Sequence, residues 1–462
     1  MTQPGQKILA VVLAAGQGTR LRSSLPKVLH PAAGRPMLDW VLRAARSAGC
    51  EDIAVVIGHG AEKVREVFSG EEVTWVLQEE QKGTGHALAQ AESAVRDPGI
   101  MLVLSGDVPL LSATTLRRLV EAAREGWASM AVAELDDPGS LGRVLTAADG
   151  SLAGIVEASD AAPQELAIGR VNAGLYALPT PDIFDFLRVL EPDNVKGELY
   201  LTDALNAAAQ QGKPIRLVEL ADPTESWGVN DRADLGRAHR ALLHRHAEGL
   251  MQVGVSILDP ESTTIEAAVS VGPDTVVHPG ASLLGNTSIG EGCTLEQGVW
   301  LRDVSVGDGT RIAPYSVLEG ADIAARCQIG PFARLRPGAV VAEGAKVGNF
   351  VEIKNSELGK GVKVNHLAYI GDAVVGEGSN IGAGVVTCNY DGRQKSPTRI
   401  GRRVFVGSDT MLVAPLDIGD EAMTAAGSVV SKDVPAGSLA VERSKQRNIA
   451  NWARRFRRRK GK

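Results

Sequence analysis

Residues 283–318 read LLGNTSIGEGCTLEQGVWLRDVSVGDGTRIAPYSVL, and an aliphatic residue returns at nearly every sixth position of this stretch. The count starts at Leu283, slips by one residue at Val306 and continues to Leu318. Neither the ~3.6-residue period of a helix nor the alternation of a strand explains this rhythm. A hexapeptide parallel β-helix does explain it, because each six-residue unit forms one side of a triangular coil and turns its aliphatic residue inward.

The same rhythm extends beyond this stretch, over 27 positions of which only Thr424 is not aliphatic. Three units make one coil, so the repeat predicts about nine coils stacked at ~4.8 Å. Residues 382–399 break the rhythm, and we expect them to bulge from one coil as a loop. The 27 positions are Ile265, Val271, Val277, Leu283, Ile289, Leu295, Leu301, Val306, Ile312, Leu318, Ile323, Ile329, Leu335, Val341, Val347, Ile353, Leu358, Val364, Ile370, Val375, Ile381, Ile400, Val406, Leu412, Ile418, Thr424 and Val430.

Before about residue 228 the sequence follows a different pattern, in which short aliphatic runs alternate with helical stretches. This alternation predicts a mostly parallel sheet with helices on both faces, as in a Rossmann-like α/β domain. Ligands bind such sheets at the carboxyl ends of the strands. The expected strands are 8–14, 53–57, 73–77, 101–104 and 171–178, and the expected helices are 37–48, 61–68, 87–95 and 114–124.

A single helical pattern joins the two parts of the chain. Its apolar stripe consists of Leu235, Ala238, Leu242 and Leu250. Its histidines, His239, His244 and His246, do not face one another at this spacing, so we expect them to be solvated rather than bound to a metal. The expected segments are an α/β domain at 1–229, a connecting helix at 230–252, and a β-helix domain with a basic tail at 253–462.

The composition is that of an ordinary soluble protein, with 44% hydrophobic and 23% charged residues in a chain of 462. No apolar stretch approaches the ~20 residues that cross a bilayer, and we expect no membrane partner. The four cysteines lack metal-site spacing, which favours reduced thiols and a cytoplasmic location.

Net charge is −6, although residues 452–462 carry seven positive charges and no acid. Since nucleic-acid binders are usually basic over a folded face, we expect no such partner, and the tail is either a solvated end or a loose aid to binding polyanionic ligands.

The strongest motif of the first part is LAAGQGTR at residues 13–20, which leaves the first expected strand at its carboxyl end. Gly16 and Gly18 let the backbone approach a ligand closely and turn N–H groups toward an anion. Arg20, with Lys27 a little further on, can neutralise phosphate charge. The motif is neither a Walker loop nor the dinucleotide-binding fingerprint. On the residues alone it is either a phosphate-binding loop or an ordinary glycine-rich turn.

A second motif, SGDVP at residues 105–109, follows the apolar run 101–104. A carboxylate at the end of a buried strand is costly unless it is paired or bound to a metal. The strand-end position favours Asp107 as a Mg²⁺ ligand that holds phosphates. The alternative role is a cap on the next helix, but Ser112 is better placed for that cap.

Together the two motifs resemble those of the sugar-phosphate nucleotidyltransferases, and the repeat resembles that of hexapeptide acyltransferases, which form left-handed β-helices. Over nearly all of residues 7–450 the chain is similar to the bacterial bifunctional family that unites glucosamine-1-phosphate N-acetyltransferase and N-acetylglucosamine-1-phosphate uridylyltransferase. The resemblance implies that acetyl-CoA acetylates glucosamine-1-phosphate and that UTP then uridylylates the product with release of pyrophosphate. It also implies a Mg²⁺ cofactor, small-molecule substrates, a homotrimer, and a product used for peptidoglycan and lipopolysaccharide.

The resemblance further implies which residues of the first part form its site. Asp107 and Asn230 would hold Mg²⁺, while Lys27 and Arg20 would assist the transfer. The attacking sugar phosphate is already anionic, so we expect no general base. The family often has Tyr where Ser105 stands, so only the backbone contact carries over. The implied nucleotide-sugar residues are Leu13, Ala14, Ala15, Gly16, Lys27, Gln78, Gly83, Thr84, Ser105, Gly106, Asp107, Gly142, Glu157, Asn172, Tyr200, Thr202 and Asn230.

Polar side chains that interrupt the repeat are the candidates in the second part: Arg336, Lys354, His366, Tyr369 and Asn380. Arg336 and Lys354 suit a phosphate clamp. His366 and His278 are the only imidazoles in the repeat, too few for a three-His zinc site. The resemblance makes His366 the general base for the attacking amine and assigns the other four to the sugar phosphate. It assigns acetyl-CoA to Ala383, Asn389, Tyr390, Ser408, Ala426 and Arg443.

The residues alone leave two other functions open. One is a nucleotidyltransferase for another sugar phosphate, whose β-helix serves only oligomerisation and regulation. The other is a scaffold of inactive domains, against which the intact Lys27, Asp107 and His366 argue. The remaining histidines of the first part, His30, His59 and His86, are expected to be structural or surface residues.

Overall fold

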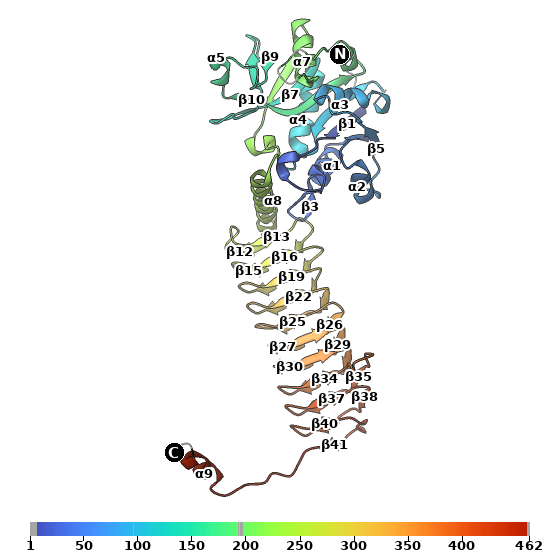
Figure 1. Cartoon of the computed structure of the whole chain (residues 1–462), viewed down its shortest axis with the longest axis vertical. Helices are drawn as coiled ribbons and strands as arrows, with labels where there is room; N and C mark the ends of the chain where they lie inside the picture. The colour runs from blue at the N-terminus through green and yellow to red at the C-terminus, as the bar shows by residue number, and fades with distance from the viewer. Residues whose placement is uncertain (1–6, 96, 193, 195–196, 460–462) are drawn as a thin grey trace. The chain divides into compact units, whose positions relative to one another are not determined.

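The computed structural model describes residues 7–95, 97–192, 194 and 197–459. The chain forms two compact units, Met1–Leu242 and Leu243–Lys462, whose elements are labelled in Figure 1. Helix α8, Arg232–Gln252, crosses the limit between the units, and the three expected segments stay a prediction. Residues 1–6 of the first segment and 460–462 of the basic tail lie outside the described residues. Among the described helices, none has the length and apolar character needed to cross a membrane.

A mixed sheet forms the centre of the first unit. Its main strands in spatial order are β11 (Ile215–Glu219), β7 (Ala128–Glu134), β10 (Arg170–Thr180), β6 (Gly99–Ser105), β1 (Lys7–Ala14), β4 (Asp52–Ile57) and β5 (Thr74–Leu77). The strands β6, β1, β4 and β5 are parallel as predicted, but β10 runs antiparallel to both β6 and β7. Alternate residues of β1 enter two separate apolar cores, so both faces of the sheet are covered. The Rossmann-like α/β class is therefore confirmed.

Four helices match the prediction within a few residues: α1 (Met37–Ser47), α2 (Ala61–Val67), α3 (Thr84–Gln90) and α4 (Ala113–Glu125). Ser112 caps α4, because its hydroxyl oxygen accepts a hydrogen bond from the Thr115 N–H at 3.2 Å. Asp107 is therefore not the cap, as predicted. The sequence did not reveal α5 (Pro163–Leu166), α6 (Ile183–Arg188), α7 (Leu201–Gln210), β7, β11, or the antiparallel pair β8 (Arg143–Thr146) and β9 (Leu152–Val156).

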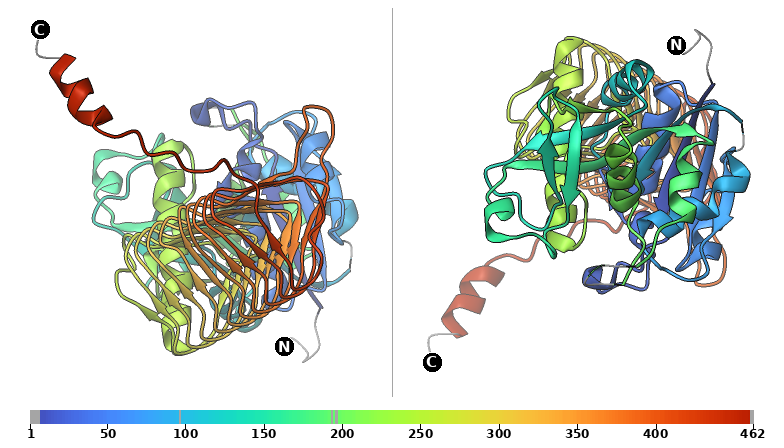
Figure 2. Two further views of the ribbon diagram at one scale, coloured as in Figure 1. Left: turned by 90° about the horizontal axis from the view of Figure 1, so that it is seen from below. Right: turned by 90° about the horizontal axis from the view of Figure 1, so that it is seen from above.

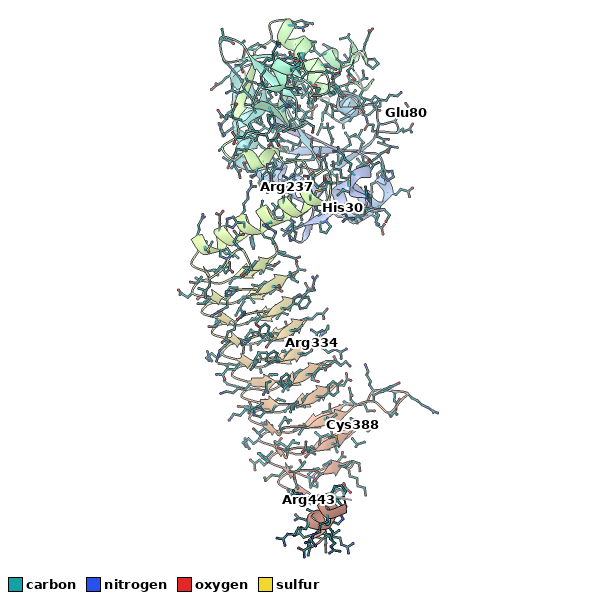
Figure 3. The ribbon with its side chains drawn as sticks, turned by 60° about the vertical axis from the view of Figure 1, so that its left-hand side comes forward. His30, Glu80, Arg237, Arg334, Cys388 and Arg443 are labelled. Carbon is teal, nitrogen blue, oxygen red and sulfur yellow. The ribbon has the colours of Figure 1, made fainter. Side chains whose placement is uncertain are left out.

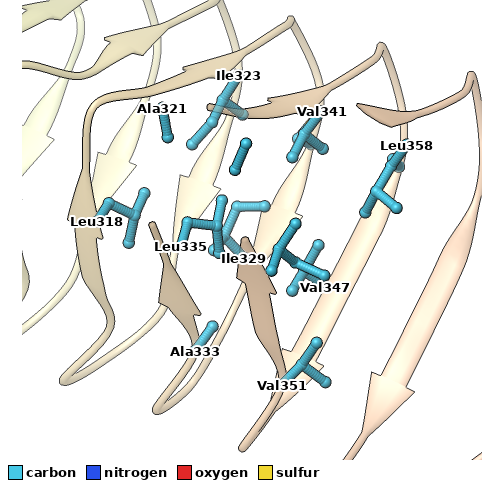
Figure 4. Packing of buried hydrophobic residues seen from close by; sticks show 14 of the residues in the cluster. Leu318, Ala321, Ile323, Ile329, Ala333, Leu335, Val341, Val347, Val351 and Leu358 are labelled. Carbon is cyan, nitrogen blue, oxygen red and sulfur yellow. The ribbon is translucent and has the colours of Figure 1, made fainter. Parts of the chain in front are cut away.

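The second unit is a left-handed parallel β-helix, which confirms the expected fold. Its short strands run from β12 (Ser256–Ile257) to β41 (Leu439–Ala440) and lie in sheets of eleven, ten and nine strands. The coils are stacked one behind another (Figure 2). All 27 rhythm positions are at most 7% exposed and fill the interior, where aliphatic side chains from successive coils pack together (Figure 4). The six-residue rhythm of the sequence therefore identifies the residues that form the core of the β-helix.

The loop between residues 382 and 399 is shorter than predicted. Strand β34 (Val386–Cys388) continues the coil and turns Thr387 inward, so only residues 389–397 form the loop. The fully buried Thr387 hydroxyl accepts a hydrogen bond from Gly371 N–H at 2.8 Å and donates to Gly371 O at 3.1 Å. Because these bonds satisfy the hydroxyl, a polar residue can occupy the inward position that the aliphatic count missed.

Two of the three histidines on α8 are not solvated, contrary to the prediction. His239 is partly buried, and its Nδ1 accepts a hydrogen bond from Ala33 N–H at 3.0 Å. His246 is also partly buried, with Nε2 at 3.1 Å from Val269 O. His244 is exposed, as predicted. Within the described part of the chain, no group of three His, Cys, Asp or Glu residues is arranged to hold a metal ion.

Candidate functional site

The glycine-rich loop begins where β1 ends, at Ala14. Gly18 adopts the left-handed conformation (φ +64°) just before the 3₁₀ turn Thr19–Leu21. A Cβ at this position would lie 2.8 Å from Lys27 Cβ, so a larger residue would push Lys27 away. No atom would crowd a Cβ at Gly16 within 4 Å, because Gly16 faces open space. The loop therefore combines an open backbone at Gly16 with a lysine held close by Gly18.

Lys27, Asp107 and Asn230 form one cluster at the carboxyl ends of β1 and β6. The Lys27 ammonium forms an ion pair with the Asp107 carboxylate and donates a hydrogen bond to Asn230 Oδ1 at 3.3 Å. Arg20 donates to the same amide oxygen at 3.4 Å. The Val229 N–H donates to Asp107 O at 2.9 Å, which brings the WGVN segment beside the SGDVP motif. Four predicted residues from three segments of the chain therefore meet at one point.

A cavity of about 300 Å³ opens beside this cluster. Gln78 lies on its wall and contacts His86 Nδ1 at 2.9 Å. Gln81 and Glu198 also line it and were not predicted, because they lie on irregular segments without a spacing signal. The predicted residues that line this cavity are Leu13, Ala14, Ala15, Gly16, Lys27, Gln78, Gly83, Thr84, Ser105 and Asp107.

A second cavity of about 550 Å³ shares Ser105 and Asp107 with the first. Its predicted lining residues are Arg20, Ser105, Asp107, Gly142, Glu157, Asn172 and Asn230. The lining residues that were not predicted include Trp227 and Arg237, whose guanidinium lies 5.7 Å from the centre of the indole ring. Trp227 precedes the predicted Asn230 within WGVN, and that proximity was the only signal in the sequence.

Three predicted residues stand behind these cavities rather than on their walls. The Thr202 hydroxyl donates to Glu157 Oε1 at 3.0 Å and so supports a residue of the second cavity. Gly106 N–H donates to Leu13 O at 2.9 Å and ties the two motifs together. Tyr200 is buried, and burial raises the pKa of its phenol to about 12. Thr202 and Gly106 therefore hold residues of the cavity walls in place.

The structure agrees with the predicted roles of the other histidines in this unit. His30 is buried. Its pKa is lowered, mainly by desolvation and to a smaller extent by the nearby charge of Arg232. His86 is partly buried and holds Gln78 in place. His59 is exposed on the surface.

In the β-helix, Lys354 and Asp372 form the centre of a polar cluster. Lys354 Nζ lies 3.0 Å and 3.1 Å from the two carboxylate oxygens of Asp372, and both side chains are largely buried. Asp372 also accepts hydrogen bonds from Asn355 and Asn389. Lys395, which was not predicted, lies in the protruding loop, where the nearby Lys354 ammonium lowers the pKa of the Lys395 ammonium. The loop therefore brings an additional cation to the predicted phosphate clamp.

The second cation of the predicted clamp is also paired with an acid. Arg336 donates to Glu352 Oε1 at 2.9 Å, and this hydrogen bond raises the pKa of the guanidinium. Glu352 aligns in register with Tyr369 on the next coil. The Tyr369 ring lies across Gly371, where a Cβ would come within 2.4 Å of the phenol oxygen. Gly371 therefore allows the ring to lie flat against its own coil.

His366 is exposed at the end of β30 (Lys363–His366). Its Nδ1 lies 2.8 Å from Asn349 Oδ1 on the preceding coil. Asn380 lies in β33 (Asn380–Ile381), the next strand of the same sheet, and aligns with Lys363. The predicted base therefore stands at a corner with its imidazole open to solvent.

Four of the six residues predicted for acetyl-CoA, Ala383, Ser408, Ala426 and Arg443, form a ladder along successive coils. Asp409 N–H donates to Ala383 O at 2.7 Å, and Gly427 N–H donates to Ser408 O at 2.8 Å. Arg443 donates to Ala426 O at 2.9 Å. Figure 3 labels Arg443 and also Cys388, which lies where the protruding loop begins.

Two residues assigned with this ladder lie apart from it in the protruding loop. Tyr390 is exposed, whereas Asn389 is buried and donates to Asp372. The structure therefore places Asn389 with the Lys354 cluster, so it contributes to that cluster through Asp372.

Comparison with known proteins finds a matching family in each of the two units. A family described as "MobA-like NTP transferase domain" matches residues 10–169, and one described as "GMPPB C-terminal domain" matches residues 265–347. A solved UDP-glucose pyrophosphorylase complexed with UDP-glucose covers 51% of this chain and 98% of its own at 21% identity, with a TM-score of 0.44. "Bifunctional protein GlmU" of Pelobacter propionicus is 47% identical over 451 residues, which is 97% of this chain and 98% of the relative. The chain belongs to the GlmU family.

Other GlmU relatives agree over the same span: that of Alkalilimnicola ehrlichii is 47% identical over 97% of both chains, and that of Syntrophomonas wolfei is 44% identical over 96% of this chain and 99% of its own. Membership of the GlmU family confirms the function expected from the sequence. The chain is a bifunctional glucosamine-1-phosphate acetyltransferase and N-acetylglucosamine-1-phosphate uridylyltransferase of UDP-N-acetylglucosamine synthesis. Its substrates are small molecules, including a nucleotide and acetyl-CoA.

Proposed function

We propose that the two cavities of the first unit divide the uridylyl-transfer substrates between them. The smaller cavity, lined by the glycine-rich loop and Gln78, takes UTP, and the larger one takes the sugar phosphate. Both cavities share Ser105 and Asp107, so the phosphates of the two substrates would meet there. The observation that carries the proposal is the cluster of Lys27, Asp107 and Asn230 at this shared wall.

Uridylyl transfer on this geometry requires charge neutralisation more than proton transfer. An oxygen of the sugar phosphate attacks the α-phosphorus of UTP, and pyrophosphate leaves. The nucleophile carries its own negative charge, so no side chain has to remove a proton. Lys27, Arg20 and the N–H groups near Gly16 neutralise the charge that accumulates on the phosphate oxygens.

The oxygen atoms of Asp107 and Asn230 suit a magnesium ion. A carboxylate oxygen and an amide oxygen converge on a single cation, which is here the Lys27 ammonium. Mg²⁺ prefers oxygen ligands and completes its shell with water and substrate phosphates, so two protein ligands suffice. When bound there, the ion would neutralise and orient the triphosphate, and Lys27 would then bind phosphate instead of Asp107.

In the second unit we place acetyl transfer at the corner that carries His366. The imidazole removes a proton from the sugar amine as the amine attacks the acetyl thioester. Lys354, Lys395 and Arg336 bind the phosphate of glucosamine-1-phosphate, and an incoming phosphate would compete with Asp372 and Glu352 for these cations. The ladder that ends at Arg443 would hold acetyl-CoA along the coils.

A homotrimer would complete this second site. The interior of the β-helix is filled by aliphatic side chains, so substrates have to bind on its outer surface. A flat outer surface buries little of a ligand, and the faces of two neighbouring copies would form a cleft. The exposed Tyr390 of the protruding loop would reach a neighbouring copy. We place the enzyme in the cytoplasm, which agrees with its four unpaired cysteines.

One assay tests both halves of the proposal. Glucosamine-1-phosphate, acetyl-CoA, UTP and Mg²⁺ are supplied together, and free thiol and pyrophosphate are measured separately. We expect thiol to appear first and pyrophosphate to require it. Pyrophosphate release with glucose-1-phosphate and no thiol release would instead support a nucleotidyltransferase for another sugar.

A further inference from the structure

Asn349 and His366 lie side by side where two neighbouring strands end. The strands β27 (Lys346–Asn349) and β30 are parallel and pair Asn349 with His366 in register. The His366 ring Nδ1 lies 2.8 Å from the Asn349 side-chain oxygen, which is a hydrogen-bond distance. Asn349 is partly buried, whereas the His366 ring is exposed. The asparagine therefore contacts one edge of the ring and leaves the other edge accessible.

The backbone fixes the distance between these two side chains. A Cβ at Gly348 would lie 1.9 Å from Asn365 O, so a larger residue would force the two coils apart. Directly after the pair, Leu367 N–H donates to Asn349 O at 3.0 Å. Both coils are thus held together on either side of the contact.

The chemistry of the contact selects one form of the imidazole. An amide oxygen accepts hydrogen bonds and donates none, so the ring nitrogen that faces it has to carry the proton. In neutral histidine only one ring nitrogen carries a proton, and the other keeps a lone pair. Contact of Asn349 Oδ1 with Nδ1 therefore leaves the lone pair on Nε2, at the accessible edge of the ring.

We propose that Asn349 is a positioning residue for acetyl transfer, which fixes His366 in the Nδ1–H tautomer with Nε2 toward the acceptor amine. The inference rests on the proposed role of His366 as the base. The amine nitrogen forms a bond to the acetyl carbon, the carbon–sulfur bond breaks, and coenzyme A leaves as the thiolate. The proton of the attacking nitrogen passes to Nε2. An uncharged amide orients the ring for this step without adding a negative charge.

The tautomer can be measured directly in the full-length enzyme. The eight histidines are labelled with ¹⁵N, and long-range ¹H–¹⁵N spectra are recorded above the titration of the imidazoles. The signal lost in the His366→Gln variant identifies His366. We expect a protonated Nδ1 and a bare Nε2 in the unsubstituted enzyme, and a mixture of tautomers in Asn349→Ala. A protonated Nε2 in the unsubstituted enzyme would overturn the proposal.

Kinetics then test whether the tautomer matters for the reaction. We expect Asn349→Ala to lower kcat of acetyl transfer roughly tenfold to a hundredfold with little change in KM, and to leave uridylyl transfer unchanged. Asn349→Asp keeps an acceptor oxygen and should restore the Nδ1–H tautomer. Asn286→Ala, at an exposed asparagine on another coil, is the matched control and should change neither signal nor rate.

The outcomes separate this inference from the proposed function. If His366→Ala leaves acetyl transfer intact, the assigned base is wrong and the proposed function fails. If His366→Ala abolishes acetyl transfer while Asn349→Ala alters neither the tautomer nor kcat, the inference about Asn349 alone is wrong. Circular dichroism of each variant checks that the β-helix has folded.

Discussion

The Lys27 ammonium forms an ion pair with Asp107 across the wall that two cavities share. The two residues come from different motifs, 80 positions apart in the sequence. Both are more buried than is usual for charged side chains, which are seldom withdrawn from water without a partner. Under the proposed assignment, a polyanionic substrate and a divalent cation together would replace both members of the pair.

Asp107→Asn should lower kcat/KM of uridylyl transfer by about 10²–10³, the usual effect of removing one preorganised electrostatic group. The carboxylate charge that would bind Mg²⁺ is lost, whereas the β-helix is untouched. Pyrophosphate release reports the loss, and thiol release from acetyl-CoA should be unchanged. Asp52→Asn serves as the control. It removes an exposed carboxylate that pairs with Lys7 where β1 and β4 begin, at the opposite ends of the strands from Asp107. An equal loss of both activities in folded protein would contradict the separation of the sites.

His366→Ala should lower acetyl transfer and leave uridylyl transfer unchanged. Loss of a general base typically costs ~10²–10⁴ in rate, or roughly 3–5 kcal/mol of barrier. Thiol release should fall by this factor, while pyrophosphate release from UTP and N-acetylglucosamine-1-phosphate should be retained. His59→Ala, at an exposed histidine of the first unit, should leave both rates as they are.

Removal of divalent cations should stop only one of the two reactions. The proposed Mg²⁺ ligands, Asp107 and Asn230, both lie at the shared cavity wall. With EDTA present, we expect pyrophosphate release to cease and thiol release to continue. Addition of excess Mg²⁺ should restore pyrophosphate release. Loss of thiol release in EDTA would show that acetyl transfer also depends on a metal.

Leu335→Ala should destabilise the β-helix by about 2–5 kcal/mol, the range for large-to-small substitutions in packed cores. Leu335 lies fully buried in the stack shown in Figure 4. Urea unfolding followed by circular dichroism measures the change. Val340→Ala, on the outer side of the next strand along the chain and 41% exposed, should cost much less.

Asp372 should make the stability of the second unit depend on pH. Burial raises the pKa of its carboxyl, but hydrogen bonds from Asn355, Lys354 and Asn389 outweigh this and hold the pKa below its ordinary value of 3.8. A carboxyl whose pKa is lowered by folding stabilises the protein above the unfolded pKa, and this contribution disappears as pH falls through the folded pKa. Asp372→Asn should therefore destabilise at pH 7, with a smaller difference from the unsubstituted protein below pH ~4. A constant difference from pH 7 to pH 3 would contradict this prediction.

The β-helix could be predicted almost completely from the sequence, because its single core repeats and each coil contacts only its neighbours. The inward positions are therefore aliphatic at a constant interval. The prediction failed at Thr387, where a hydroxyl bonded to Gly371 occupies an inward position. A search for aliphatic residues alone cannot detect a polar side chain whose partner lies 16 residues away.

The first unit was harder to predict because its sheet mixes strand directions. The parallel strands β1, β4 and β6 are continuous apolar runs, but the antiparallel pair β8 and β9 is short and only partly buried. Of the site, the motifs gave Gly16, Lys27 and Asp107. Trp227 and Lys395 were not predicted, because no motif in the sequence links Trp227 to Arg237 or Lys395 to Lys354.

The ladder of Ser408, Ala426 and Arg443 follows the axis of the β-helix from one coil to the next. Ser408 and Ala426 are 18 residues apart, which is one complete turn of the solenoid, and each turn advances the chain by ~4.8 Å. Excision of one whole interior turn would shorten this surface by one such step, and the coils on either side would still pack aliphatic side chains against each other. Under the proposed binding of acetyl-CoA along the ladder, the length of the binding surface would therefore change only in whole turns.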